Sequence, residues 1–326
     1  MKGQLVTWAT AILDWFLGLQ IYLPIAEVAL NVFLLLGLGA GVGILSGLFG
    51  VGGGFLLTPL LIFVGVPPAV AVATQSNQVV ASSVSGVLAH WARGNVDVKM
   101  GTVMLVGGME ALSYVTLSGF NALGALSPTI NRPFDLNRDG IVIGEAAAVL
   151  VLEPLERAKA RGAHVFAEFV SYGLAADGNH ITAPSPEGDG MARAMRTALR
   201  LGGLAPEAIA YINAHGTGTA LNDASETAAI RRTFGAHADR LCLSSIKPMI
   251  GHTLSAAGAI EAAATVLSLA GQFAPPTLNY ETPDPACDLD VVPNVARNLD
   301  MEYAMSNSLA FGGNNASLIF RRAEAA

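Results

Sequence analysis

The chain has 326 residues, of which 52% are hydrophobic and only 13% are charged, and its mean hydropathy is +0.50. Ordinary soluble domains carry charge on about a quarter of their residues, so a fully soluble protein is excluded and part of this chain is expected to face lipid. The net charge is −7 and there is no basic stripe of the kind that neutralises phosphates, which excludes nucleic acid as a partner.

Charge is distributed unevenly along the chain. From Val28 to Ala92 there is no Asp, Glu, Lys or Arg, whereas the sequence after about residue 106 has the composition of a mildly acidic globular domain. The contrast predicts two parts, an α-helical membrane segment over residues 1–106 and a globular domain over residues 107–326.

Several stretches of the first part have the length and apolar character of membrane elements. Met1–Leu23 is rich in aromatic residues and is expected at the membrane interface, with a secretory signal peptide as the alternative. Val28–Phe49 is long enough to cross a bilayer as one helix, and Ala69–Trp91 is expected to cross again. Phe55–Val64 is too short to span, so a re-entrant or broken helix is predicted there.

The first part carries four motifs: Gly47-Leu-Phe-Gly-Val-Gly-Gly-Gly-Phe-Leu-Leu-Thr-Pro59, Gly65-Val-Pro-Pro68, Ala73-Thr-Gln-Ser-Asn77 and Arg93-Gly-Asn-Val-Asp97. Together these motifs resemble the sulfite exporter TauE/SafE family of anion permeases. The resemblance covers about residues 20–106 and implies membrane insertion, and the polar run Thr74–Gln78 is compatible with a transport path. Members of that family have about twice as many membrane helices, so the resemblance implies a fragment.

After Gly108 short β-like runs alternate with helical stretches, which predicts an α/β layered domain. Asp223 and Glu226 have the spacing of a capping box and predict a helix start there. The expected strands are Val149–Leu152, Ala167–Tyr172, Ala210–Asn213 and Leu241–Ser244, and the expected helices are Gly190–Arg200, Ala224–Thr233 and Ala257–Leu269.

Three motifs of this part carry chemistry. His215 follows a strand and opens a glycine-punctuated loop with the hydroxyls of Thr217 and Thr219. Lys247 is followed five residues later by His252, which lies before a small-residue helix whose dipole is expected to keep the imidazole neutral. Ser306–Asn315 is expected to be a loop whose backbone N–H groups can face a developing oxyanion.

Each motif also has a structural interpretation. His215 could be a hydrogen-bonded structural residue, Lys247 a solvated loop charge, and the two threonines simple turn formers. The order of the motifs favours chemistry, because His-Gly-Thr-Gly-Thr, Lys-x-x-x-x-His and Phe-Gly-Gly-x-Asn together resemble the second half of the β-ketoacyl-[acyl-carrier-protein] synthases. Further matches are Arg132-Pro-Phe-Asp135, Arg138-Asp-Gly140, Gly144-Glu145, Ala158-Lys-Ala-Arg-Gly162 and Ala274-Pro-Pro-Thr277 before Asn279.

The resemblance implies a partial thiolase-like fold, mostly its C-terminal half, and decarboxylative Claisen condensation of an acyl thioester with malonyl-ACP. It implies that His215 and His252 promote decarboxylation, that Lys247 completes the site and that Glu261 supports this lysine. The hydroxyls of Thr217 and Thr219 are expected to bind pantetheine, and Phe311-Gly-Gly313 is expected to supply gating and oxyanion N–H groups. The phosphopantetheine arm of the acyl carrier protein serves as substrate carrier, no bound cofactor or metal is implied, and the family is usually homodimeric.

The family's nucleophilic cysteine has no match in this sequence. The two cysteines, Cys242 and Cys287, lie in a predicted strand and an acidic loop, and neither has metal-ligand spacing. Condensation is therefore expected to fail, and at most malonyl decarboxylation is expected of this chain. The alternatives left open are an anion permease fragment and a non-functional chimera joined at Leu-Val-Gly-Gly, residues 105–108. The expected location is the bacterial inner membrane, with the synthase-like part in the cytoplasm.

Overall fold

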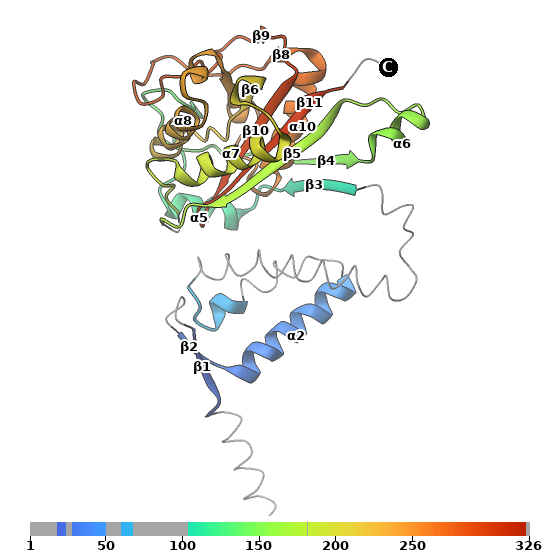
Figure 1. Ribbon diagram of the computed structural model, residues 1–326. Coiled ribbons are helices and arrows are strands. Elements are labelled where there is room, and N and C mark those ends of the chain that lie inside the picture. The colour runs from blue at the N-terminus through green and yellow to red at the C-terminus, as the bar shows by residue number, and fades with distance from the viewer. Residues whose placement is uncertain (1–17, 24–27, 50–59, 68–103, 181, 324–326) are drawn as a thin grey trace, which may run out of the picture. The chain divides into compact units, whose positions relative to one another are not determined.

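The computed structural model describes residues 18–23, 28–49, 60–67, 104–180 and 182–323 (Figure 1). Contacts divide the chain into two compact units, Met1–Met100 and Gly101–Ala326. The predicted interfacial stretch before residue 18 and the predicted second crossing, Ala69–Trp91, lie outside the described residues.

In the described part of the first unit, an antiparallel pair of strands is followed by a helix. Strands β1 (Gln20–Leu23) and β2 (Val28–Asn31) pair antiparallel, and α2 (Val32–Phe49) follows directly. The prediction of one continuous helix from Val28 was therefore wrong at its start. The side-chain Oδ1 of Asn31 accepts the N–H groups of Phe33 and Leu34 at 2.9 and 3.1 Å, so Asn31 caps the helix and ends the strand.

The helix α2 contributes to a small apolar cluster together with a helical stretch at residues 60–63. The buried members of this cluster are Leu30, Val42, Leu61 and Val66. Its 18 residues correspond to about 27 Å of rise, slightly less than the roughly 30 Å hydrocarbon core. Within the described residues, the helical stretch with the length and apolarity of a membrane span is Leu254–Gly271, which is 39% buried. That stretch lies in the second unit and packs in its core, as described next.

The second unit is built on a five-stranded sheet with strand order β5-β11-β10-β6-β7. Strand β10 lies parallel to β6, and β6 parallel to β7, whereas β11 is antiparallel to both of its neighbours. The strands are β5 (Ala167–Ala176), β6 (Ile209–Asn213), β7 (Cys242–Ser244), β10 (Tyr303–Ala310) and β11 (Asn314–Arg322).

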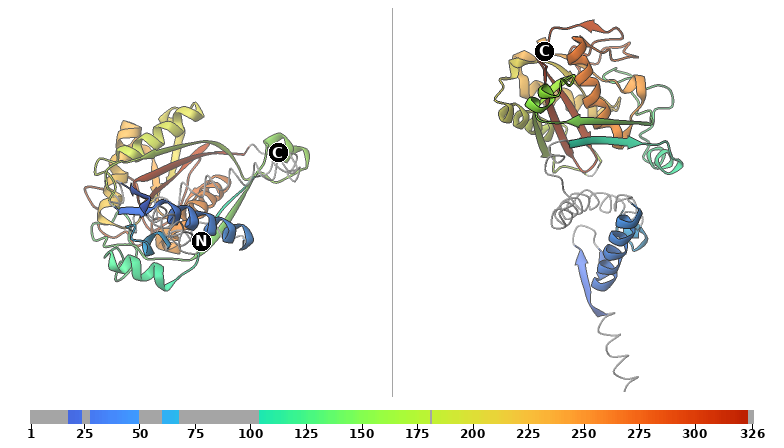
Figure 2. Two further views of the ribbon diagram at one scale, coloured as in Figure 1. Left: turned by 90° about the horizontal axis from the view of Figure 1, so that it is seen from below. Right: turned by 90° about the vertical axis from the view of Figure 1, so that its right-hand side faces the viewer.

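Helices cover both faces of this sheet. The helix α7 (Asp189–Gly202) packs on β5 and β11, with α8 (Ala220–Phe234) beside it, and α10 (Ala257–Gly271) packs on the opposite face (Figures 1 and 2). Neighbouring strand residues alternate between the two cores: Ile212 lies in the α7 core and Tyr211 in the α10 core. The predicted α/β layering is confirmed, as are the predicted strands and helices, within a few residues at their ends.

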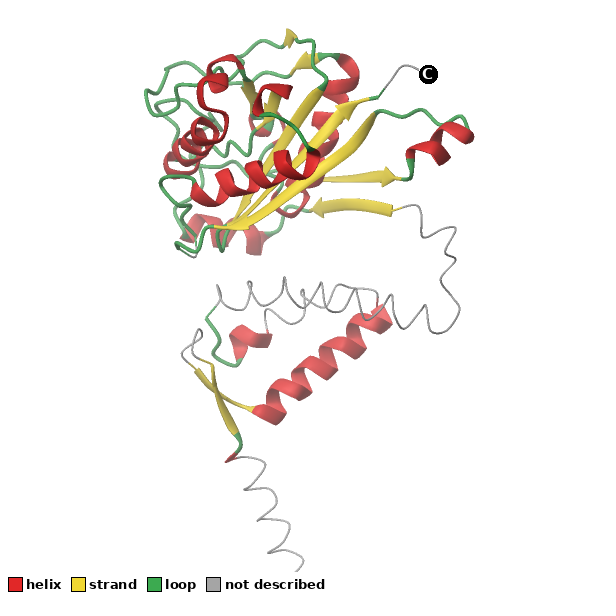
Figure 3. Cartoon of the chain, viewed as in Figure 1, coloured by secondary structure: helices red, strands yellow, loops and turns green. Residues whose placement is uncertain are grey.

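Smaller elements surround the layers (Figure 3). Strand β3 (Met104–Glu110) pairs antiparallel with β4 (Ala146–Leu152), so the Leu-Val-Gly-Gly sequence at residues 105–108 lies in a strand. The remaining elements are α5 (Tyr114–Ala122), α6 (Leu155–Ala160), α9 (Lys247–Ile250), β8 (Phe273–Ala274), β9 (Arg297–Asn298) and the 3-10 turns η2 (Pro206–Ala208), η3 (Gly235–Arg240) and η4 (Leu254–Ala256).

The predicted capping box at Asp223 and Glu226 was wrong. Helix α8 already begins at Ala220, with Thr219 as the N-cap whose hydroxyl accepts the N–H of Asn222 at 3.3 Å. Asp223 and Glu226 lie inside the helix and are fully buried. Their carboxylates turn toward the preceding loop instead of toward the helix's own start.

Candidate active site

The site begins where two parallel strands end side by side. Asn213 at the end of β6 is paired with Ser244 at the end of β7. The carboxyl ends of neighbouring parallel strands deliver their following loops to one edge of the sheet. His215 and Lys247, far apart in the sequence, are brought together in this way.

Lys247 connects His215 with Glu261. Its Nζ atom lies 3.3 Å from Nδ1 of His215 and also contacts the backbone carbonyl of His215 and the Glu261 carboxylate. Lys247 and Glu261 are each only 1% exposed, so the interpretation of Lys247 as a solvated loop charge was wrong. Removing an ion pair from water is costly, and this one is compensated by the additional hydrogen bonds of the ammonium group.

The second histidine faces the first. The ring centroids of His215 and His252 lie 5.3 Å apart with the planes at 83°. The backbone of His252 is held at both ends by the segment before β4, because its N–H donates to the carbonyl of Val142 at 2.6 Å and its carbonyl accepts from Gly144 at 3.1 Å.

The hydrogen bonds assign the same tautomer to both rings. Nδ1 of His252 accepts the N–H of Leu254 at 3.2 Å, so the ring proton resides on Nε2. Nδ1 of His215 faces the ammonium of Lys247, which can only donate, so this ring too carries its proton on Nε2. Both imidazoles thus have an Nε2–H group available as a donor.

Burial keeps both histidines neutral. It lowers the pKa of His215 well below the usual value, and the charge of Lys247 lowers it further. The pKa of His252 is lowered well below its usual value too, first by burial and then by Lys247. Burial and the neighbouring Lys247 charge thus both favour the neutral form of His252 that the sequence predicted.

Asp223 and Glu226 shape the loop that carries His215, a role that the sequence reasoning missed. The Glu226 carboxylate accepts the N–H groups of His215 and Gly216, both at 2.9 Å. The Asp223 carboxylate accepts those of Phe134, Thr217 and Gly218, at 2.8 to 3.2 Å. Burial raises the pKa of Asp223 and raises that of Glu226 to about 7. The two carboxylates therefore fix the backbone of the histidine loop from inside α8.

The two threonines continue the same loop. The hydroxyl of Thr217 is hydrogen bonded to that of Thr219 at 2.9 Å, and Thr219 caps α8. In this structure both threonines therefore make the local contacts expected of turn formers. Their predicted contact with pantetheine stays a prediction.

Ser306–Asn315 was predicted to be a loop, but it forms the end of a β-hairpin. The prediction is correct only for the turn. Strands β10 and β11 pair up to Ala310 and Asn314, which leaves only Phe311, Gly312 and Gly313 in the turn. Both glycines have positive φ angles, 81° and 70°, a backbone region that L side chains rarely adopt. The pairing of β10 with β11 continues through the polar residues Ser306, Asn307 and Ser308.

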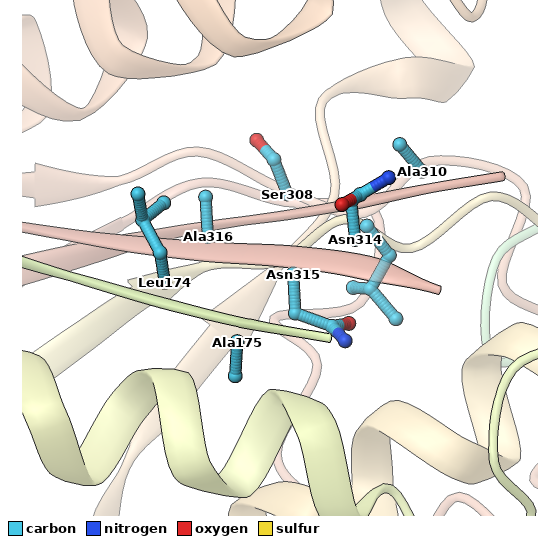
Figure 4. Close-up of a pocket in the computed structure, with 8 residues that line it drawn as sticks. Leu174, Ala175, Ser308, Ala310, Asn314, Asn315 and Ala316 are labelled. Carbon is cyan, nitrogen blue, oxygen red and sulfur yellow. The ribbon is translucent and has the colours of Figure 1, made fainter. Parts of the chain in front are cut away.

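The turn is held from two sides. The Phe311 ring stacks on Phe120 with a centroid distance of 5.9 Å, and the carbonyl of Gly313 accepts the N–H of Asp177 at 2.7 Å. Figure 4 shows the hairpin end, where an open cavity of about 360 Å³ is lined by Leu174, Ala175, Ser308, Leu309, Ala310, Asn314, Asn315 and Ala316. The strands thus present an open hollow beside the turn.

Two family models match separate parts of this chain. The model described as Beta-ketoacyl synthase, C-terminal domain, matches residues 166–281, and the model of the Sulfite exporter TauE/SafE matches residues 35–124. Among curated relatives, 3-oxoacyl-[acyl-carrier-protein] synthase 2 of Staphylococcus aureus is 49% identical over 239 residues, 72% of this chain and 56% of the relative. The protein of the same name from Synechocystis is 48% identical over 226 residues, 67% of this chain and 54% of the relative.

Solved structures agree with this match. The crystal structure of a β-ketoacyl synthase from Burkholderia phymatum is 41% identical, with a TM-score of 0.66 over 80% of this chain and 67% of that one. The chain belongs to the β-ketoacyl synthase family. The ishigamide ketosynthase/chain length factor is similar as well, with 44% identity and a TM-score of 0.65 over 73% of this chain and 57% of that one.

The two family models confirm both resemblances that the motifs indicated. The chain spans a little over half the length of the curated relatives that it matches. The TauE/SafE match reaches residue 124, yet the structure places β3 and α5, which lie before that residue, in the second unit. The β-ketoacyl synthase-like unit and the TauE/SafE-like match therefore share residues 104–124.

Proposed function

We propose that this chain decarboxylates malonyl thioesters carried on acyl carrier protein. The observation that carries the proposal is the pair of neutral imidazoles that face each other with their Nε2–H groups free to donate, beside a buried lysine. Neutral donors in a dry site stabilise a developing enolate oxygen better than water does, because they need no reorganisation.

The reaction follows from these donors. The bond between C2 of the malonyl group and its carboxylate carbon breaks, CO₂ leaves, and the electron pair forms the thioester enolate. The enolate oxygen accepts hydrogen bonds from Nε2 of His215 and Nε2 of His252, and a proton then adds to C2 to give the acetyl thioester. Lys247 keeps the proton of His215 on Nε2 through its contact with Nδ1, and Glu261 balances the lysine charge.

The carrier and its arm belong to the same proposal. The phosphopantetheine arm would pass the hydroxyls of Thr217 and Thr219, and the N–H of Phe311 in the glycine turn would face the thioester oxygen. The support is the position of both threonines in the loop of His215 and the two left-handed glycines that expose the turn backbone. No bound cofactor or metal is required for these steps.

Condensation is not part of the proposed activity, because the cysteines of this chain are poor nucleophiles. Cys242 begins β7 and Cys287 lies in the apolar core, and both are buried and free of disulfides. Burial raises the pKa of Cys242, and it raises that of Cys287 to about 12, so neither is a thiolate at neutral pH. We infer that this chain forms no acyl-thioester of its own.

The test is acetyl-ACP formation from malonyl-ACP, followed by mass spectrometry. His252→Ala is expected to lower the rate at least tenfold. The matched control is His164→Ala, which changes an exposed histidine that packs edge-on against Phe166 and should leave the rate unchanged. Equal rates for wild type and His252→Ala would remove the proposal.

For the first unit we propose residence in a lipid bilayer, with the synthase-like unit in the bacterial cytoplasm and homodimers as in the family. The support is the TauE/SafE match and the uncharged run from Val28 to Ala92. Anion transport is the second candidate function and rests on that match alone. Anion flux into vesicles that contain the chain would favour it.

We also propose that the two parts were joined near residues 105–108. The TauE/SafE match runs past this point to residue 124, while β3 already pairs with β4 of the synthase-like unit. One long read of native DNA across the codons of Arg93–Arg132 tests the origin of the join. An unbroken read establishes a natural fusion, and a break there means that two unrelated genes were assembled.

A further inference from the structure

The backbone of the loop that carries His215 is held by two separate sets of groups. In the first set, the carbonyl of His215 accepts a hydrogen bond from Lys247. The carbonyl of Gly216 accepts one from the Ser245 hydroxyl at 2.7 Å. The N–H groups of the same two residues donate to the Glu226 carboxylate. This first set therefore fixes the part of the loop that contains the histidine.

The second set comes from residues 131–140, which precede the loop by about 80 positions. This segment donates to four consecutive carbonyls, those of Thr217, Gly218, Thr219 and Ala220. The donors are, in the same order, Nδ2 of Asn131 at 2.7 Å, the N–H of Gly140 at 3.0 Å, and Nε and Nη2 of Arg138, both at 3.1 Å. Arg138 alone thus supplies two of the four donors, because its planar guanidinium presents several N–H groups in one fork.

The guanidinium of Arg138 is itself fixed on its remaining side. Its Nη1 atom donates to the carbonyl of Asp135 at 2.9 Å and pairs with the Asp284 carboxylate. Its Nε atom lies 4.0 Å from Oδ2 of Asp223, the carboxylate that accepts N–H groups of the same loop. The Arg138 side chain is only 6% exposed. A buried side chain with this many partners keeps one position, and the loop backbone follows it.

The two threonine hydroxyls lie on the backbone that Arg138 holds. They are hydrogen bonded to each other at 2.9 Å, while the carbonyls of Thr217 and Thr219 are occupied by residues 131–140. A hydroxyl offers one donor and two acceptor positions, so both retain capacity for a ligand. The pantetheine arm is a chain of amide groups, which needs donors and acceptors at fixed positions.

We propose that Arg138 is a positioning residue for the pantetheine arm. Through the carbonyls of Thr219 and Ala220 it sets where the threonine hydroxyls meet the arm, and it acts without touching the reacting thioester. The proposal rests on the proposed function, in which these hydroxyls bind the arm. Because His215 is held by the first set of groups, a change at Arg138 should weaken binding of the arm and leave the chemical step nearly intact.

Binding of acetyl-pantetheine to the full chain in detergent micelles, measured by isothermal titration calorimetry, tests the proposal without requiring turnover. The informative variant is Arg138→Lys, because lysine keeps a positive charge beside Asp284 but does not reproduce the fork that reaches both carbonyls. We expect its Kd to be at least tenfold higher. The matched control is Arg161→Lys, the same change in a side chain that is 59% exposed beside Glu153, and it should bind like wild type.

Two substrates separate positioning from a merely structural role. With malonyl-pantetheine, Arg138→Lys is expected to raise KM at least tenfold and to change kcat less than threefold. Malonyl ethyl thioester has no pantetheine arm, so its kcat/KM should be the same for the variant and for wild type. A structural defect would instead lower turnover of both thioesters together.

Asn131→Ala provides a second variant, because it removes the donor to Thr217 from the same segment at a different point. It should show the same loss for the arm alone, and it decides the test if circular dichroism shows Arg138→Lys to be unfolded. Equal Kd values for wild type and the folded variant, or a wild type that does not bind acetyl-pantetheine, overturn the proposal. An equal loss with both thioesters also overturns it. Weaker binding by the variant of a chain that does not decarboxylate supports the role of Arg138 and removes the proposed function instead.

Discussion

At the scale of single residues, the site depends on the buried carboxylates of Asp223 and Glu226, which hold the histidine loop through its backbone N–H groups. Glu226 accepts two backbone N–H groups of the histidine loop, and its pKa is raised to about 7 from 4.5 by burial. Between these two pH values the folded state binds more protons at Glu226 than the unfolded state does. Stability contributed by this group therefore falls as pH rises through the window and levels off above it.

Glu226→Gln cannot titrate and so removes this pH dependence. The free energy of unfolding of wild type minus that of the variant is expected to fall by roughly 3 kcal/mol from pH 4.5 to 7.5, at about 1.4 kcal/mol per pKa unit. Denaturant unfolding of both proteins at several pH values measures the difference. A difference that is constant with pH would contradict the assigned burial of the charge.

Lys247 and Glu261 form a buried ion pair whose two members protect each other. Lys247→Met leaves the Glu261 charge without a partner, and such a loss costs about 3–5 kcal/mol. The double variant Lys247→Met with Glu261→Gln should lose much less than the sum of the two single losses, because no unpaired charge remains. Urea unfolding of the four proteins gives the coupling. Additive losses would show that the pair is not formed.

At the scale of elements, the short segment before β4 positions the second histidine. Gly144 donates its N–H to the carbonyl of His252, and a Cβ atom at Gly144 would lie 2.1 Å from the carbonyl oxygen of Ile250. Gly144→Ala should therefore push this segment away from His252 and lower both stability and malonyl decarboxylation, the latter about tenfold or more. The control is Gly119→Ala in α5, where a Cβ atom meets nothing within 4 Å and helix propensity improves. Equal effects of both variants would contradict the positioning role.

The sequence predicted the elements that follow local rules better than the contacts between them. The strands β6 and β7 and the helices α7 and α10 follow from apolar runs and turn residues, and the structure has them. The start of α8 was misplaced because Asp223 and Glu226 match the spacing of a capping box. Only tertiary packing shows that these carboxylates reach back to the loop at His215. The hairpin at Phe311 was missed for a similar reason, since strand pairing fixes its length.

At the scale of the whole molecule, we expect the first unit to associate with lipid and the second unit to fold as a globular domain. The uncharged run of the first unit should keep the full chain in the membrane fraction, whereas the second unit has a mixed α/β core with buried carboxylates and histidines. Carbonate washing of bacterial membranes at high pH should leave the chain in the pellet. A matched chain with Leu38 and Ala40 of α2 replaced by Lys should be released, because a charge near the centre of a span is costly. Release of the unaltered chain would contradict membrane residence.

We propose that the chain decarboxylates malonyl-ACP without condensing it, and intact-mass spectrometry with two substrates tests this proposal most directly. Purified chain is incubated with malonyl-ACP and a medium-chain acyl-ACP, and both the carrier and the chain are weighed. The structure predicts acetyl-ACP, no 3-oxoacyl-ACP and no acyl adduct on Cys242 or Cys287. An acyl adduct on the chain, 3-oxoacyl-ACP, or malonyl-ACP left intact by the wild-type chain would contradict the account.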